Sequence, residues 1–407
     1  MRPMPDTSLR FPAAAPDDLP ALDPDALAHG KRVAAHLHAC IARAGGWLPF
    51  EQWMDEALYA PGLGYYTAGS AKLAEGGAWQ AGDFVTAPEL TPLFGQALAT
   101  QVAHVLQQTG SDQVMEFGAG TGALAESLID ALDGMGLAVR YAIVEVSGDL
   151  RARQRERLAR HADRITWLDA LPDGFAGCVI ANEVLDAMPV RLFRWDEQGR
   201  PCERGVVSLT AESGVGPGFA WQDRPAPPEL AAALQARMPP LPGYVSEINL
   251  RAEAWVREMG AWLRRGAALL IDYGFPRAEY YHPQRATGTL MCHVRHHAHA
   301  EPLVLPGLQD ITAHVDFTAM ADAALEGGLD VLGYTSQARF LIEAGLPALL
   351  AQRMQGADAA EQARAAAPVH KLLSEAEMGE LFKVLAVGRG LDGPLPAFRR
   401  GDRRHML

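Results

Sequence analysis

Cysteine is scarce in this chain of 407 residues, which has only four: Cys40, Cys178, Cys202 and Cys292. They are scattered and form no CxxC pair, so the sequence predicts neither a disulfide framework nor a zinc site. Such a pattern is typical of a reducing compartment. Long apolar runs are also missing, because none approaches the roughly 18 residues of a membrane-spanning helix. We therefore expect no disulfides, no bound metal and no insertion into a membrane.

Basic residues are outnumbered, with 36 Lys and Arg against 49 Asp and Glu, and the formal net charge is −13. This balance repels nucleic acid and anionic lipid, so binding of nucleic acid is not expected. The first residues lack the apolar stretch of a signal peptide, and Asp17 and Asp18 are unlike a transit peptide. A cytoplasmic location is the expectation.

The hydrophobic pattern changes along the chain and predicts its organisation. Residues 1–25 are rich in Pro, Ala and Asp and predict a flexible arm. Apolar residues at helical spacing predict helices at 27–44 and 50–59. We expect a helical N-terminal or lid region over 26–110, a core over 111–390 with insertions at about 191–250, 278–315 and 337–380, and a tail over 391–407.

Strand and helix patterns alternate within the core, which is typical of βαβ units and a parallel sheet. The expected fold class is α/β, with the ligand crevice at the carboxyl ends of the strands. Before the core, Thr86 and Glu89 have capping-box spacing, which predicts one helix from there to about Gln107. Residues 225–242 are rich in proline and predict a loop. Strands are expected at 113–117, 140–146, 165–168, 176–181, 267–272, 289–294, 331–335 and 382–387.

A glycine-rich turn follows the first core strand, with Gly118, Gly120 and Gly122 at alternate positions. Glycines there permit positive φ angles and let a ligand approach the backbone closely. The N-terminus of the helix that follows offers free N–H groups. The stretch Gly118-x-Gly120-x-x-Ala123 also satisfies the alanine-ended dinucleotide fingerprint, so a nicotinamide cofactor is an alternative.

Acidic residues at the strand ends favour S-adenosylmethionine over a dinucleotide. Glu116, two residues before the first glycine, places a carboxylate where a cationic amino-acid moiety could bind. Glu145 ends the next strand, and a carboxylate there can accept both ribose hydroxyls, which fits either cofactor. Asp169 ends the third strand, where it could accept the adenine amine or cap the following segment.

Asn182, Glu183 and Asp186 follow the fourth strand, facing the crevice where a transferred methyl group would lie. Methyl transfer from a sulfonium is an in-line displacement, so the protein mainly aligns the acceptor. A guanidinium acceptor is protonated and poorly nucleophilic, and carboxylates beside it can localise its charge. Glu183 and Asp186 are the pair that could do so; the alternative is that one caps a helix and the other faces solvent.

Six ordered motifs span roughly residues 45–390. They are GYY at 64–66, GDFVTAPE at 82–89 with FG at 94–95, EFGAGTG at 116–122, ANEVLDAMP at 181–189, LIDYG at 270–274 and DITAHVDF at 310–317. Together they resemble the MidA family, whose mitochondrial members are complex I assembly-factor methyltransferases. Val184 and Leu185 depart from the family, which often has aromatic residues there.

The resemblance implies a class I methyltransferase fold, Rossmann-like, with a mostly parallel seven-stranded sheet and S-adenosyl-L-methionine bound over the glycine turn. It places Asp83, Thr86 and Glu89 in a lid over the cofactor and Asn182, Glu183 and Asp186 near the acceptor. His314 lies in the last motif, where it could orient the substrate. For mitochondrial relatives the resemblance implies symmetric dimethylation of an arginine on a respiratory complex I subunit.

The expected partner is a protein substrate with an exposed arginine, such as a complex I subunit. Methylation of a small molecule and a role as an assembly factor that binds S-adenosylmethionine without turnover are alternatives. The oligomeric state is left open, a homodimer included. His293, His296, His297 and His299 crowd together but lack a ligand set with zinc spacing, so we predict no metal there.

Overall fold

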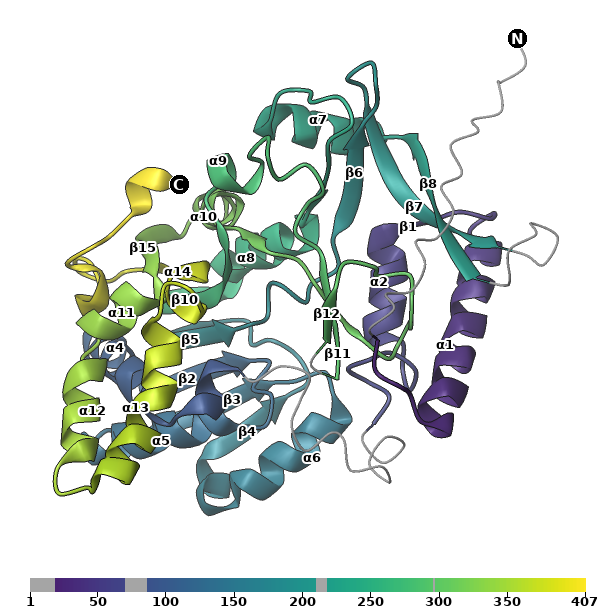
Figure 1. Ribbon diagram of the computed structural model, residues 1–407. Coiled ribbons are helices and arrows are strands. Elements are labelled where there is room, and N and C mark those ends of the chain that lie inside the picture. Colours follow the sequence, from purple (N-terminus) through teal and green to yellow (C-terminus); the bar gives the residue numbers. More distant parts are fainter. Residues whose placement is uncertain (1–18, 70–85, 210–217, 296) are drawn as a thin grey trace, which may run out of the picture. The chain divides into compact units, whose positions relative to one another are not determined.

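The computed structural model describes residues 19–69, 86–209, 218–295 and 297–407, and its elements are labelled in Figure 1. The chain divides into two compact units. As far as these ranges are described, unit 1 comprises Met1–Phe84, Ala187–Arg251 and Ala278–Ala313, and unit 2 comprises Val85–Asp186, Ala252–Arg277 and His314–Leu407. The segment 86–110 therefore contributes to unit 2, and the segments 187–251 and 278–313 join the N-terminal region in unit 1.

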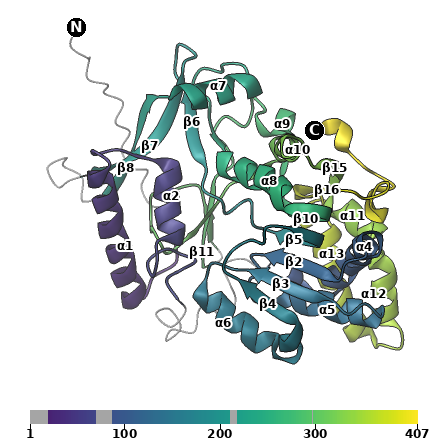
Figure 2. The same ribbon diagram turned by 180° about the vertical axis from the view of Figure 1, so that it is seen from behind.

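Unit 2 is built on a seven-stranded path of strands in the order β15-β16-β10-β5-β2-β3-β4, visible from behind in Figure 2. The pairs along β10-β5-β2-β3-β4 are parallel, and β16 is antiparallel to both of its neighbours. The strands are β2 (Gln113–Phe117), β3 (Arg140–Val144), β4 (Ile165–Leu168), β5 (Phe175–Asn182), β10 (Leu263–Phe275), β15 (Asp330–Ser336) and β16 (Phe382–Arg389). The predicted α/β class with a mostly parallel seven-stranded sheet is confirmed.

The direction of strand order reverses at β2, because the chain continues to β3 and β4 on one side and to β5 and β10 on the other. Such a switch point opens a crevice at the carboxyl ends of the strands. A short strand, β14 (Val315–Asp316), pairs in parallel with the end of β10 and brings His314 to the same edge. The residues that follow β2, β3, β4, β5 and β10 therefore share one edge of the sheet.

Helices cover the sheet of unit 2 because its strands are apolar on both faces. Helix α4 packs on α5, β5 and β10, while α10 packs on β10, β15 and β16. The aromatic ring of Phe117 contacts Trp255 of α8. The helices are α3 (Ala87–Leu90), α4 (Leu93–Thr109), α5 (Ala123–Gly134), α6 (Gly148–Arg157), α8 (Leu250–Trp262), α10 (Phe317–Glu326), α11 (Gln337–Glu343), α12 (Leu346–Met354), α13 (Ala359–Leu373) and α14 (Met378–Leu381), with short 3-10 turns at η3 (Ala159–Arg164), η5 (Pro396–Phe398) and η6 (Arg404–Met406).

The helix predicted from Thr86 to about Gln107 is wrong in one respect, because it is broken into α3 and α4. Pro92 disfavours helical backbone at the residue before it, and Thr91 is extended with φ −165° and ψ 139°. Thr86 precedes α3, but its side chain makes no capping bond. The capping box predicted from Thr86 and Glu89 is therefore absent, and the Glu89 carboxylate has other partners.

Unit 1 contains a sheet in the order β1-β7-β6-β9, with β8 paired to β7, and a second sheet in the order β12-β11-β13. Its apolar cluster joins α1 and α2 to these strands. The predicted loop over 225–242 is wrong, since it contains α7, which begins at Pro228 where a helix tolerates proline. Its elements are α1 (Pro24–Arg43), β1 (Leu48–Pro49), α2 (Phe50–Tyr59), β6 (Arg191–Trp195), β7 (Pro201–Leu209), β8 (Gly218–Pro225), α7 (Pro228–Arg237), β9 (Val245–Ile248), α9 (Arg277–Tyr280), β11 (Met291–Val294), β12 (His297–His299) and β13 (Asp310–Thr312).

Across the described ranges, no helix combines the length and the apolar character needed to cross a bilayer.

Candidate functional site

The glycine turn between β2 and α5 adopts the backbone that its glycines predict. Gly118, Gly120 and Gly122 have φ angles of 62°, 53° and 88°, a region that other L-residues rarely adopt. The turn is held at its start by the N–H of Gly118, which donates to the carbonyl of Val144 at 3.0 Å. At its three glycines the turn therefore presents main chain without a side chain to the crevice.

Two of these glycines differ in what surrounds them. A Cβ added to Gly120 would meet no atom within 4 Å, so the space beside this residue is open. A Cβ on Gly118 would lie 3.1 Å from Cγ2 of Val184, in the loop after β5. The glycine turn at 118–122, which we call the cradle, and the loop carrying the predicted acceptor residues are thus neighbours within unit 2.

Glu145 follows β3 and is 5% exposed. One carboxylate oxygen accepts from the N–H of Ser147 at 2.9 Å, and the other accepts from Nε2 of Gln154 at 3.1 Å. Each oxygen has two lone pairs, so both can still accept a hydroxyl hydrogen. Burial raises the pKa of Glu145, and these hydrogen bonds oppose that rise. The arrangement suits a carboxylate that binds both hydroxyls of a ribose.

Gln154 is a fully buried residue whose role in the site the sequence does not indicate. From α6 it donates to the carbonyl of Gly120 at 2.9 Å and to Glu145, and its oxygen accepts from Nε1 of Trp167 at 2.9 Å. It thereby links the glycine turn, the expected ribose carboxylate and β4. A glutamine within a helix otherwise rich in arginine carries no sequence signal for this role, because only the packing of α6 shows its partners.

We predict that Gln154→Ala weakens binding of S-adenosyl-homocysteine about fivefold to a hundredfold, as expected for a loss of about 1–3 kcal/mol when buried partners lose a hydrogen bond. Isothermal titration calorimetry measures this change. Gln101→Ala is the matched control, because Gln101 is also buried but bonds to the N–H of Ala397. The control should lower thermal stability and leave affinity unchanged. Equal losses of affinity in both variants would contradict the role given to Gln154.

Glu116 lies within β2, is 2% exposed and accepts a hydrogen bond from the Tyr141 hydroxyl at 2.7 Å. Desolvation raises the pKa of Glu116 to about 7, against the lowering effect of the Tyr141 hydrogen bond, and the nearby charge of Glu145 adds to the rise. Its predicted contact with a cationic amino-acid moiety requires the ionised form. Binding of such a ligand should therefore depend on pH in the neutral range.

We expect the affinity for S-adenosyl-homocysteine to rise about tenfold between pH 6 and pH 8, because Glu116 with a pKa of about 7 passes from mostly protonated to mostly ionised. In the protein without ligand, the free energy of unfolding changes with pH in the opposite direction. The raised pKa of Glu116 stabilises the fold at low pH, and this contribution is lost as pH rises through about 7. Calorimetry across this range measures the first effect. Glu116→Gln should flatten the profile; an unchanged slope would exclude Glu116 as its cause.

Asp169 directly follows β4 and has a side chain that is 85% exposed. It forms an ion pair with Nη1 of Arg151 at 2.6 Å. Arg151 also donates to the carbonyls of Glu145 and Leu168, at 2.7 and 3.0 Å. Asp169 therefore lies at the expected strand end, and its contact with an adenine amine stays a prediction.

Of the three residues predicted to form a lid, Asp83 lies outside the described residues. Glu89 accepts hydrogen bonds from the Thr121 hydroxyl, within the glycine turn, and from Nη1 of Arg157 at 3.3 Å. Arg157 also donates to the Thr121 oxygen at 2.6 Å. Glu89 thus contacts the turn itself, whereas Thr86 lies just before α3 with no capping role for its side chain.

Asn182, Glu183 and Asp186 are brought together after β5. Nδ2 of Asn182 donates to Oε1 of Glu183 at 3.0 Å. Within the described chain, Oδ1 of Asn182 is buried and has no hydrogen-bond partner. Glu183 has φ 55°, a strained conformation for a residue with a side chain, and such strain clusters at functional sites. Its N–H donates to the carbonyl of Ile271 at 2.9 Å, which ties the strained residue to β10.

Asp272, in β10, holds this loop in place. It is fully buried and accepts hydrogen bonds from the N–H groups of Leu185 and Asp186 at 3.0 and 3.2 Å, and from that of Tyr273 at 2.9 Å. Burial, together with the nearby charges of Asp186 and Glu183, raises the pKa of Asp272 well above its ordinary value. As the last residue of an expected strand, Asp272 could either be structural or line the acceptor crevice, and its contacts favour the structural role.

Tyr273 connects the predicted acceptor residues to His314. Its hydroxyl donates to Oδ2 of Asp186 at 2.5 Å, and its ring packs edge-on against the His314 ring at 5.0 Å. His314 also stacks on Phe275, with centroids 5.3 Å apart and planes 7° apart. The sequence carries no signal for Tyr273, because only the pairing of β10 with β14 brings it between Asp186 and His314.

The residues at this edge fit S-adenosylmethionine. The open space beside Gly120 admits a nucleoside, Glu145 retains acceptor capacity for its ribose, and Glu116 provides a carboxylate below the turn. Beside this cradle, the loop after β5 offers carboxylates and an amide oxygen to a cationic or hydrogen-donating acceptor. The arrangement can hold a methyl donor and align an acceptor next to it.

Comparisons with known proteins point the same way. The family model described as "Putative S-adenosyl-L-methionine-dependent methyltransferase" matches residues 97–335. The mitochondrial protein arginine methyltransferase NDUFAF7 homologue of Drosophila melanogaster is 28% identical, over 89% of this chain and 86% of that protein. The protein arginine methyltransferase NDUFAF7 of Danio rerio is 27% identical, over 88% and 87%. A crystal structure from Burkholderia thailandensis, bound to S-adenosyl-homocysteine, is 52% identical with a TM-score of 0.87, over 96% of this chain and 100% of that chain.

Proposed function

The chain belongs to the family of S-adenosyl-L-methionine-dependent methyltransferases, and from that premise we propose that it methylates an arginine side chain of a protein. The predicted cofactor, S-adenosylmethionine, is confirmed by the family and by the similar structure that holds S-adenosyl-homocysteine. The resemblance found in the sequence motifs is confirmed as well. The identity of the acceptor is the step that the proposal adds.

The observation that supports an arginine acceptor is the set of oxygens after β5. Glu183 is held by Asn182, and Asp186 is held by Tyr273 and, through its N–H, by Asp272. A guanidinium has five N–H donors in a planar fork and matches carboxylates in bidentate fashion. Oriented carboxylates with a buried amide oxygen beside them are therefore suited to a guanidinium.

The chemistry requires an acceptor nitrogen with an available lone pair. When bound, S-adenosylmethionine supplies a methyl group on a positively charged sulfur, for in-line attack. Asp186 draws the guanidinium charge toward the nitrogen that it contacts, and Glu183 accepts a hydrogen bond from the attacking nitrogen, which thereby keeps more of its lone pair. As the N–CH₃ bond forms and the S–CH₃ bond breaks, the nitrogen releases a proton, which the Glu183 carboxylate accepts.

The names of the relatives, protein arginine methyltransferases, support a protein acceptor. The MidA resemblance makes a respiratory complex I subunit the first acceptor to test. The decisive experiment incubates the full chain and tritiated S-adenosylmethionine with complex I subunits and with an arginine-rich peptide library. A library with lysine in place of arginine is the matched control. Hydrolysis and chromatography then identify the labelled amino acid.

We expect label in methylated arginine with the wild-type chain, and far less with Asp186→Asn, whose binding of S-adenosyl-homocysteine should be unchanged. Label in lysine or only in small molecules of a cell extract would overturn the arginine assignment. Binding of cofactor with no label in proteins or metabolites would instead indicate an assembly factor without turnover.

A further inference from the structure

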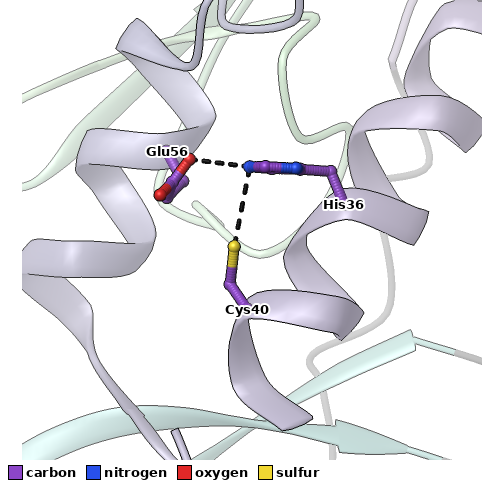
Figure 3. A group of neighbouring side chains, drawn as sticks. All are labelled: His36, Cys40 and Glu56. Carbon is purple, nitrogen blue, oxygen red and sulfur yellow. Dashed lines mark hydrogen bonds and ion pairs between the residues drawn. The ribbon is translucent and has the colours of Figure 1, made fainter. Parts of the chain in front are cut away.

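Three side chains of metal-ligating type converge between α1 and α2 in unit 1 (Figure 3). His36 and Cys40 lie one turn apart on α1, and Glu56 lies on α2. One ligand atom from each, the His nitrogen, the Cys sulfur and a carboxylate oxygen, lies within 4.8 Å of the others. Among the described residues, these three form the group of His, Cys, Asp and Glu side chains whose ligand atoms lie close enough together to hold one metal ion.

The separation between the nitrogen and the sulfur matches that around a tetrahedral zinc ion, and the carboxylate oxygen lies closer to the nitrogen than such an ion would place it. Residues four apart on a helix face the same way, so both α1 ligands point toward α2. Nε2 of His36 and Sγ of Cys40 are 3.5 Å apart, and Zn–N and Zn–S bonds of about 2.1 and 2.3 Å at a tetrahedral angle place these atoms about 3.6 Å apart. Oε2 of Glu56 is 2.7 Å from Nε2. It would have to move about 0.7 Å farther from Nε2 to reach the same geometry.

The surroundings combine an enclosed sulfur with an open side. Cys40 is 6% exposed within the apolar cluster of unit 1, whereas the side chains of His36 and Glu56 are 29% and 37% exposed. An ion can enter from the His36–Glu56 side, and a water molecule can complete four-coordination there. A thiolate and a carboxylate would neutralise the charge of a divalent ion.

The thiol proton of Cys40 and the positive charge of Arg43 both affect how tightly such a site would bind a cation. Burial raises the pKa of the Cys40 thiol, the charge of Glu56 adds to this, and Arg43 opposes it. An ion must therefore displace the thiol proton, and binding should strengthen as pH rises. Nη2 of Arg43 donates to the sulfur at 3.1 Å. Its positive charge opposes a cation, but Arg43 is exposed at the end of α1 and can rotate toward solvent.

We propose that His36, Cys40 and Glu56 bind one divalent transition-metal ion of the zinc type, with water as the fourth ligand. The His, Cys and carboxylate donor set suits zinc. The ion would tie α1 to α2 and thereby stabilise unit 1. This differs from the sequence prediction of no metal, because Glu56 joins the other two residues only through the packing of α1 on α2.

The test uses the full chain, freed of metal by a chelator and titrated with Zn²⁺ in competition with a colour-forming chelator. We expect one equivalent to bind, and Cys40→Ser and Glu56→Gln each to weaken binding at least about tenfold. Cys202→Ser and His297→Ala are matched controls for other thiols and imidazoles and should bind as wild type. Arg43→Gln should bind more tightly, since it removes an opposing charge.

Co²⁺ in place of Zn²⁺ gives a second readout that needs no variant, because a Cys40 ligand produces a thiolate-to-cobalt charge-transfer band. Absence of that band, failure of Zn²⁺ to raise the melting temperature of the wild type, or binding that survives Cys40→Ser would each overturn the proposal. So would loss of binding in Cys202→Ser. The His36–Glu56 contact would then be a hydrogen bond between two helices and no more.

Discussion

Gly120→Val should lower the affinity for S-adenosyl-homocysteine by up to about a hundredfold while the chain stays folded. Valine at the φ of 53° costs about 1–2 kcal/mol. Its side chain would also extend into space that is open in the structure and that the nucleoside needs, at a further cost of about 1–3 kcal/mol. The strain lowers the stability of the free and the bound chain alike, so the loss of affinity comes from the occupied space, and about 3 kcal/mol corresponds to about two orders of magnitude in affinity.

Gly110→Val separates this effect from backbone strain alone. Gly110 has a φ of 68°, ends α4, and a Cβ there would also meet no atom within 4 Å. The two variants should lose similar stability in thermal unfolding, whereas only Gly120→Val should lose affinity in calorimetry. Undiminished binding by Gly120→Val would refute the cradle at this turn.

The glycine turn was predictable because its chemistry is local. Three glycines at alternate positions between a strand and a helix require positive φ angles, and all three have them. The strands were predictable for a related reason, since short apolar runs separated by helical patterns allow few alternatives; β2 begins and ends at the predicted residues. Local signals thus determined the sheet and the backbone of the cofactor site.

What the sequence could not predict depends on contacts between distant residues. Gln154, Tyr273 and the positioning role of Asp272 arise from the packing of α6 and from the pairing of β10 with its neighbours. The predicted helix is broken before Pro92, and the capping box is absent because the contacts of Glu89 with Thr121 and Arg157 outweighed a local preference. Hydrophobic periodicity is a local pattern, so it does not indicate which residues far apart in the sequence will be in contact.

At Glu183 the backbone conformation favours glycine, whereas the proposed reaction requires a carboxylate. Its φ of 55° costs about 1–2 kcal/mol relative to ordinary backbone, and glycine would relieve that strain. Glycine also costs about 0.5–1 kcal/mol through the entropy of the unfolded chain. Glu183→Gly should therefore unfold at the same temperature as wild type or slightly above it.

Glu183→Gln keeps the strained backbone and removes the charge, so the two variants isolate the carboxylate. On the proposed function, both should lower the rate of methyl transfer at saturating cofactor and acceptor by about 10²–10⁴, the usual contribution of a group that accepts a proton in the reaction. Single-turnover assays with tritiated cofactor measure the rate, calorimetry checks that affinity for S-adenosyl-homocysteine changes less than about threefold, and scanning calorimetry gives stability. Full activity in Glu183→Gly would show that the strain serves the loop and not the chemistry. Lost activity with undiminished stability would show instead that the strained backbone is retained because it holds this carboxylate, fixed by Asn182, against the acceptor.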